Sequence, residues 1–291
     1  MNPLPENPEL VPETLSSSAF DLPIGPLAEP APATPQHPPW WDVFVLAVLT
    51  VISVMLLFAS MVAAVVITME WIYPHLGMAE IVRMPLVAVF GEAVGYLLIL
   101  PCMYLVTRVR NLPDFLAGIH WNWPSKPGRY FLAGFVLSLA LQGVAHLLPI
   151  PKNLPIDSFF RTSAEAWTLS IFGITLAPLM EELYFRGFLY PVLDRLFGVA
   201  AAILKVDRRI GVAVAILLTA APFALLHGSQ LRFSWGPVLV IFLVGVVLTA
   251  VRAVTSSVAA GLLVHVAYNA TISILMFVAT DGFRHLERLN Q

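Results

Sequence analysis

Ionisable and amide side chains recur one helical turn apart in apolar stretches of this sequence. Glu182 and Arg186 are four residues apart, as are His265 and Asn269, and His227 lies between the two pairs. Residues spaced by four share one face of a helix. A carboxylate with a histidine can deprotonate water, and a histidine with an amide can donate hydrogen bonds to an oxyanion. These are the groups needed to hydrolyse an amide bond without a covalent intermediate.

Glu181 and Glu182 are adjacent, yet we expect them to have different roles. Successive helix residues are rotated by about 100°, so the two side chains point in different directions. Arg186 lies on the face of Glu182 in the favourable order, and pairing would lower the cost of burying both charges. Glu181 has no such partner, which makes it the candidate base. The alternative is that this run marks a helix end, with its side chains reaching water.

The composition places these groups in a membrane. The chain of 291 residues is 58% hydrophobic and 12% charged, with a mean hydropathy of +0.82, whereas soluble domains have about 25% charged residues. So few charges cannot cover a water-facing surface. A net charge of −2 indicates no nucleic-acid partner, since phosphate binding needs clustered cations. The single cysteine, Cys102, excludes an internal disulfide and a CxxC metal site.

We predict an all-α, polytopic bundle of seven or eight transmembrane helices. A span needs about 20 apolar residues, and in lipid its backbone must be satisfied internally, as in a helix. Seven stretches qualify: 43–68, 84–107, 130–151, 166 to about 181, 210–231, 233–251 and 253–280. An eighth span could lie at 187–204, where Pro191 is expected to kink or interrupt the chain.

The distribution of charge predicts a tail and an orientation. Residues 1–39 are acidic and proline-rich and contain no Lys or Arg, so we expect a disordered tail ahead of a bundle at 40–291. Basic residues at 108–129 place that loop, and with it the tail, in the cytoplasm. The basic residues at 195–209 fit the same side only if 187–204 does not cross. Charge therefore favours seven crossings.

Taken together, the polar motifs resemble the CPBP family of membrane proteins. This family comprises CAAX prenyl proteases and bacteriocin-processing proteins, including the type II CAAX, or Abi/CAAX, proteases. The resemblance covers residues 166–280. In chain order, the motifs are Glu181-Glu182-x-x-x-Arg186, Phe223-x-x-x-His227 and His265-x-x-x-Asn269.

The resemblance implies a glutamate-dependent intramembrane endopeptidase, typically with eight transmembrane helices, and we give that count more weight than the charges. It implies no metal or other cofactor. It also implies a membrane-associated protein or peptide as substrate and suggests a prokaryotic plasma membrane. The implied roles are water activation by Glu181 and His227, an oxyanion site at His265 and Asn269, and support from Glu182 and Arg186.

Three alternatives stay open. Glu181, His227 and His265 could form a zinc site with two histidines and one carboxylate. The chain could be a non-proteolytic scaffold or immunity-type protein, with the motifs only joining helices. A transporter with a polar midplane site is a third possibility, but no internal repeat supports it.

Glu92 and His146 are ionisable residues of the apolar stretches that match none of the motifs. Glu92 lies between Gly91 and Gly95, where two helices can approach closely. We therefore interpret Glu92 as a hydrogen-bonding group across that helix contact, in preference to a residue of the substrate cavity.

Overall fold

The computed structural model describes residues 37–290 except 111, 113, 152 and 153, and in this part the chain is helical without β-strands. The tail predicted at 1–39 lies outside the described residues as far as residue 36. The elements in chain order are α1 (Pro39–Ile67), η1 (Thr68–Ile72), α2 (Met78–Ile81), α3 (Pro85–Val109), α4 (Phe115–Gly118), α5 (Pro127–Ala145), η2 (Pro155–Phe159), α6 (Ser163–Ile174), α7 (Leu176–Glu182), η3 (Leu183–Leu189), α8 (Tyr190–Leu204), α9 (Arg208–Leu226), η4 (Ser229–Leu231), α10 (Trp235–Thr255), α11 (Val258–Ala279) and η5 (Leu286–Asn290).

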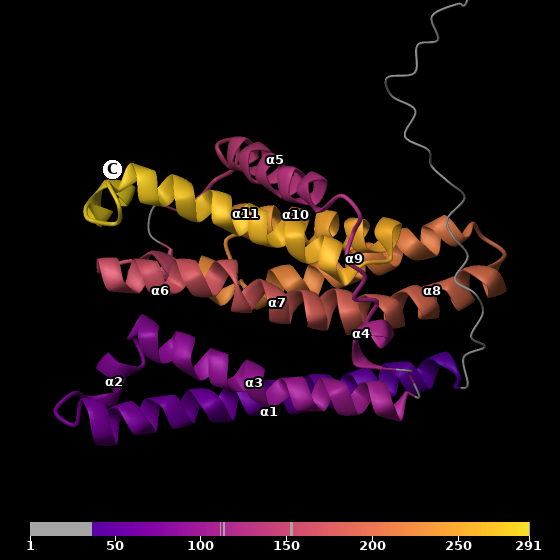
Figure 1. Cartoon of the computed structure of the whole chain (residues 1–291), viewed down its shortest axis with the longest axis horizontal. Coiled ribbons are helices and arrows are strands. Elements are labelled where there is room, and N and C mark those ends of the chain that lie inside the picture. The colour runs from indigo at the N-terminus through magenta and orange to yellow at the C-terminus, as the bar shows by residue number, and fades with distance from the viewer. Residues whose placement is uncertain (1–36, 111, 113, 152–153, 291) are drawn as a thin grey trace, which may run out of the picture. The chain divides into compact units, whose positions relative to one another are not determined.

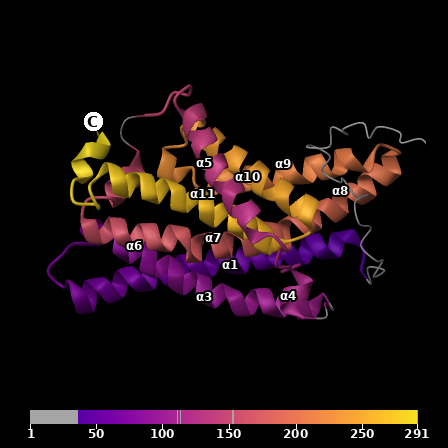
Figure 2. The same ribbon diagram turned by 45° about the horizontal axis from the view of Figure 1, so that its top comes forward.

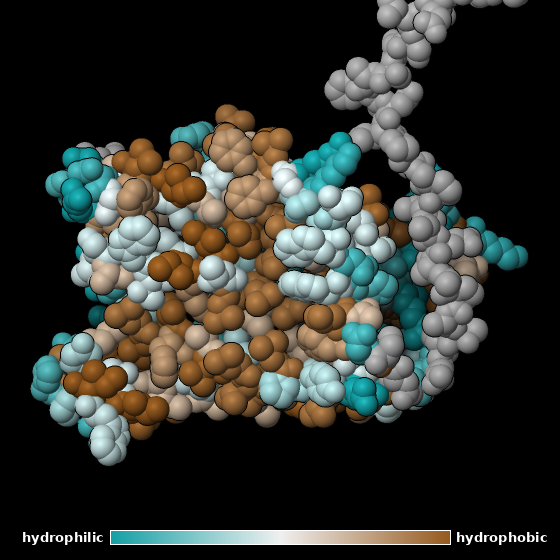
Figure 3. Space-filling view, in the orientation of Figure 1, coloured by the Kyte–Doolittle hydropathy of each residue, from teal (hydrophilic) through white to brown (hydrophobic). Residues whose placement is uncertain are grey.

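Seven helical segments of the described chain are long and apolar enough to cross a membrane. They are α1 with η1, α3, α5, the composite Ser163–Leu204, α9, α10 and α11. Large apolar side chains cover their outer surface; Phe58, for example, is 71% exposed and Val254 75%. Figure 3 shows apolar side chains across the middle of one face and hydrophilic ones gathered towards its ends. The protein is therefore a multi-pass membrane protein, and the predicted all-α bundle is confirmed.

A composite helix contains the segment where an eighth span was expected. α6, α7, η3 and α8 follow one another in one line (Figures 1 and 2) over 42 residues, about 63 Å at 1.5 Å per residue. Residues 187–204 continue this helix and form no separate span within the described chain. The described chain therefore has seven candidate spans, the number that the charge pattern favours, and the eighth span expected from the family resemblance is not a separate helix.

Pro191 does not interrupt the composite helix because the winding changes just before it. η3 is π-helical, and the Tyr190 N–H bonds to the Phe185 carbonyl, five residues back. In the same register, residue 191 would bond to the Arg186 carbonyl, but proline has no N–H. The Nε–H of Arg252 donates to that carbonyl instead, at 3.1 Å. A side chain from α10 therefore satisfies the backbone group that the proline leaves open.

The basic segments meet at one end of the bundle. The buried carboxylate of Asp42, at the start of α1, pairs with Arg110 Nε after α3 (2.9 Å) and with Arg195 on α8. The Val258 N–H, at the start of α11, bonds to the His120 carbonyl, in the loop before α5, at 3.1 Å. The basic stretches 108–129 and 195–209 thus share one end, as the charge pattern predicts. Which side of the membrane this end faces stays a prediction.

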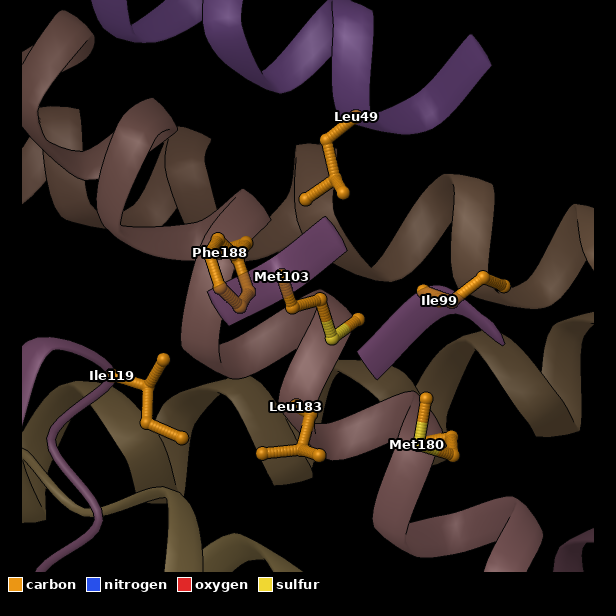
Figure 4. Close-up of a cluster of buried hydrophobic side chains, with 7 residues drawn as sticks. All are labelled: Leu49, Ile99, Met103, Ile119, Met180, Leu183 and Phe188. Atoms are coloured by element: carbon orange, nitrogen blue, oxygen red, sulfur yellow. The ribbon is translucent and has the colours of Figure 1, made fainter. Parts of the chain in front are cut away.

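A buried apolar cluster positions α7 and η3 against the first two long helices. Figure 4 shows its members, which are Leu49 of α1, Ile99 and Met103 of α3, Ile119, Met180 of α7, and Leu183 and Phe188 of η3. Thr50 and Tyr184 add a hydroxyl–hydroxyl hydrogen bond of 2.5 Å between α1 and η3. Because lipid is as apolar as these side chains, close packing and such hydrogen bonds hold the helices together.

The remaining long helices pack on the opposite face of η3. A second buried cluster joins Phe185 of η3 to Phe223 of α9, Leu248 of α10 and Val264 of α11. α5 lies across α11 (Figure 2). Their close approach depends on Gly134, where a Cβ atom would lie 2.2 Å from the Val264 carbonyl oxygen. α7 and η3 are thus held between two packed layers.

Candidate active site

Glu181, His227 and His265 converge from three helices. Glu181 is in α7, His227 follows the last residue of α9, and His265 is in α11. Nε2 of His227 lies 3.7 Å from Glu181 Oε1, and Nε2 of His265 lies 3.6 Å from Oε2. These separations are too long for direct hydrogen bonds but suit a bridging water. Residues far apart in sequence therefore surround one point, as the motifs predict.

The hydrogen bond at the back of His227 assigns the role of each ring nitrogen. Nδ1 lies 2.9 Å from the Phe223 carbonyl oxygen. A carbonyl can only accept, so Nδ1 carries the proton and the neutral ring presents the Nε2 lone pair to Glu181. Two acceptors thus face each other, and a water between them can donate one proton to each.

Glu182 points away from this space and has cationic and imidazole partners. Its Oε1 accepts from Arg186 Nη1 at 2.8 Å and from His265 Nδ1 at 3.0 Å. The side chains of Glu182 and Arg186 are 0% exposed, whereas that of Glu181 is 19% exposed. The predicted Glu182–Arg186 pair is therefore present, and Glu182 also orients the His265 ring.

All three guanidinium nitrogens of Arg186 are engaged. Besides the Nη1 bond to Glu182, Nη2 donates to the Gly245 carbonyl at 3.0 Å and Nε to Thr249 Oγ1 at 3.3 Å. The guanidinium carbon lies 4.7 Å from the centre of the Phe223 ring, a favourable cation–π distance. Arg186 is thus fully buried and held by interior acceptors.

The second oxygen of Glu182 explains the presence of Gly261 on α11. Glu182 Oε2 is buried and has no hydrogen-bond partner among the described residues. A Cβ atom at Gly261 would lie 2.7 Å from this oxygen, which is closer than the two atoms can pack. Any larger residue at position 261 would therefore displace Glu182, and through it His265.

His265 and Asn269 lie one turn apart on α11, as their spacing predicts. Asn269 Nδ2 donates to the Gly173 carbonyl at the end of α6, at 2.6 Å. An amide nitrogen carries two hydrogens, so one remains available. Both side chains line the same cavity.

Two cavities, each of about 290 Å³, border the convergent residues. The first lies between α1, α3 and α7 and is largely apolar, with Val54, Leu57 and Ile99 among its walls. The second lies between α3, α6, α10 and α11 and contains His265 and Asn269. Four residues line both cavities, and these are Glu92, Glu181, His227 and Gln230. Space for a chain thus exists on both sides of Glu181.

The structure corrects our interpretation of Glu92. Gly91 and Gly95 do allow close approach, since Cβ atoms there would lie 3.1 Å and 2.7 Å from atoms of α1. The hydrogen bond of Glu92, however, comes from Tyr96 on the same helix, at 2.7 Å, and does not cross to α1. The preferred interpretation was therefore wrong, and the carboxylate belongs to the cavity.

Sequence reasoning missed Gln230 and leaves His146 without a role. Gln230 lies in η4, three residues after His227, and a polar residue so close behind a motif histidine was the available signal. His146 is exposed at the end of α5 and lines neither cavity.

Glu181, His227 and His265 are also the candidate zinc ligands. Among the described residues, no group of three or more His, Cys, Asp or Glu side chains is arranged to hold a metal ion. The separations of 3.6–3.7 Å between Glu181 and the two Nε2 atoms are close to those between ligands of one tetrahedral zinc, and both Nδ1 atoms are hydrogen-bonded, as in metal-bound histidines. Zinc binding and metal independence both stay predictions.

Comparison with known proteins gives one family. Residues 162–271 match the Rce1-like model, described as type II CAAX prenyl endopeptidase Rce1-like. No curated protein and no solved structure matches the chain significantly. The matched segment runs from the start of α6 into α11 and contains all the motif residues.

Proposed function

We propose that this chain, which belongs to the CAAX protease family through residues 162–271, is an intramembrane endopeptidase. It hydrolyses a peptide bond of a membrane-associated protein or peptide, and it acts in a prokaryotic plasma membrane. The observation that carries the proposal is the convergence of Glu181 with His227 and His265 beside two cavities.

The attacking water would sit between Glu181 Oε1 and His227 Nε2. Both atoms accept hydrogen bonds, so they orient the water and leave an oxygen lone pair for the scissile carbonyl carbon. As the carbon–oxygen bond forms, Glu181 takes one proton from the water. When the tetrahedral intermediate collapses, the carbon–nitrogen bond breaks and the leaving amine takes the proton from Glu181. The base thus returns to its starting state.

The developing oxyanion would be stabilised from α11. Asn269 contributes the Nδ2 hydrogen that is not bonded to Gly173. His265 Nδ1 donates to Glu182, so Nε2 can donate as well only when the ring is an imidazolium. Glu181 and Glu182 lie against this ring, with carboxylate oxygens 3.6 Å from Nε2 and 3.0 Å from Nδ1. Glu182 and Arg186 therefore act through His265 and do not contact the substrate.

A scaffold role remains the alternative function, and a single substitution separates the two. Cells carrying the Glu181→Gln variant should accumulate an uncleaved membrane protein that wild-type cells process, measured by comparative proteomics of membrane fractions. Glu70→Gln is the matched control, because Glu70 is exposed and lines neither cavity. If Glu181→Gln complements the deletion phenotype fully, the scaffold explanation is correct.

A further inference from the structure

Glu92 faces the reaction space but takes no part in the steps above. It lines both cavities together with Glu181 and His227. An ionisable side chain inside a membrane protein is costly, at about 2.5–3.5 kcal/mol on insertion scales, and usually marks a functional site. Glu92 is therefore placed to contact a substrate bound in either cavity.

The two cavities share two carboxyl groups, those of Glu92 and Glu181. Neither cavity is lined by a Lys or Arg among the described residues. Glu182 is paired with Arg186, and all three guanidinium nitrogens of Arg186 donate to interior acceptors. The carboxyl groups of Glu92 and Glu181 thus face the open space with no Lys or Arg beside them among the described lining residues. A substrate that brings a cation would supply that partner.

The Glu92 carboxylate is held in an orientation that suits an acceptor. The Tyr96 hydroxyl donates to Oε1 at 2.7 Å, and the Tyr96 ring stacks on Phe172 of α6, with centroids 6.2 Å apart and an interplanar angle of 6°. Tyr96 is the only hydrogen-bond partner of Glu92 within the described part of the chain. An ionised carboxylate has room for about four acceptor interactions, so further donors can be accommodated.

We propose that Glu92 is a specificity-determining residue that binds the cationic side chain of a Lys or Arg next to the scissile bond. The proposal rests on the endopeptidase function above. Because Glu92 borders the space on both sides of Glu181, the recognised residue lies beside the bond under attack. A guanidinium or ammonium group is the complementary ligand, since charge-assisted hydrogen bonds to a carboxylate are the strong ones.

A binding experiment tests this without turnover. The probes are a fluorescent, leucine-rich nonapeptide amide with a central arginine and its twin with citrulline, which has nearly the same shape and no charge. Binding is measured by anisotropy with the purified full chain carrying Glu181→Gln, so that the peptide stays intact. We expect the arginine peptide to bind about tenfold more tightly, and the added Glu92→Gln to remove that preference. The added Glu70→Gln, as matched control, should retain it.

A cleavage experiment keeps the two proposals apart. Wild-type protein in nanodiscs is given a randomised library of hydrophobic peptides, and the products are sequenced by mass spectrometry. We expect Lys and Arg to be enriched within two residues of the cut and Glu92→Gln to lose the enrichment. Equal binding of the two nonapeptides, or a preference that survives Glu92→Gln, overturns the role of Glu92. Absence of Glu181-dependent cleavage overturns the endopeptidase and leaves the binding result to stand by itself.

Discussion

Two adjacent glutamates define two different regions of this protein. Behind α7, Glu182 is fully buried and holds Arg186 and His265 by hydrogen bonds of 2.8 Å and 3.0 Å. In front, Glu181 borders two cavities and keeps 3.6–3.7 Å from its histidine neighbours. The same side chain, rotated by one helix position, is a structural anchor in one case and a free acceptor in the other.

Inside the membrane, the glutamate that supports the site and the glutamate that reacts have different surroundings. A buried charge is tolerated when partners satisfy it, and then it resists movement. A charge that must react needs open space and weaker contacts. Substitutions around Glu181 should therefore lower the catalytic activity, and substitutions around Glu182 should lower the stability of the fold.

The largest effect is expected in front, from Glu181→Gln. Removing the base should lower the rate of peptide cleavage by about 10³-fold, within the range of general-base catalysis. The melting temperature should not change, because Glu181 makes no direct hydrogen bond to either histidine. Initial rates and thermal unfolding measured on the same preparation check both statements. Retained activity would place the base elsewhere.

Behind the site, Arg186→Met should lower the free energy of unfolding by about 3–5 kcal/mol, because it leaves the charge of Glu182 buried without its cation. Denaturant unfolding in detergent micelles measures this loss. Arg208→Met is the matched control: Arg208 also pairs with a carboxylate, Asp194 at 2.7 Å, but it is half exposed, so the cost should stay below about 1 kcal/mol. Similar losses in the two variants would contradict the distinction.

Asn269→Ala tests the proposed oxyanion donors near Glu181. Removing one oxyanion donor typically lowers kcat by about 10²–10³-fold. KM should change little, because the contact is made mainly in the transition state. Steady-state kinetics separate the two parameters. A change confined to KM would instead indicate a binding role for Asn269.

Gly261→Ala connects the two regions through a single methyl group. The new Cβ would press on Glu182 Oε2 at 2.7 Å, so we expect a stability loss of about 1–3 kcal/mol. Cleavage should fall as well, because a displaced Glu182 turns His265. Gly143→Ala is the control, since a Cβ there meets no atom within 4 Å. If Gly261→Ala behaves like Gly143→Ala, Glu182 is not tightly held.

The smallest effect is expected from metal removal. Treatment of the purified protein with a strong chelator should leave the cleavage rate unchanged, because Glu181 and the histidines act on water directly in the proposed mechanism. The rate before and after dialysis measures this. Inhibition that zinc specifically reverses would favour the alternative with two histidines and one carboxylate.

The motif residues were predictable, but the residues around them were not. His265 and Asn269 stand one turn apart, so their shared face follows from helical geometry alone. Glu92 and Gln230 carry no such spacing relative to Glu181. Their place beside both cavities depends on how α3 and η4 pack against α7, and no local pattern encodes that packing.

The sequence by itself determined the membrane-spanning helices, the polar motifs and the pairing of Glu182 with Arg186, because hydropathy and helical periodicity are local properties. The tertiary structure decided the rest. It joined 187–204 to the preceding helix, since the Arg252 side chain satisfies the carbonyl that Pro191 leaves open. It also brought Glu92 to the cavity and turned Glu181 towards two histidines while Glu182 faced inward. These outcomes depend on contacts between residues far apart in the chain, which only packing in three dimensions defines.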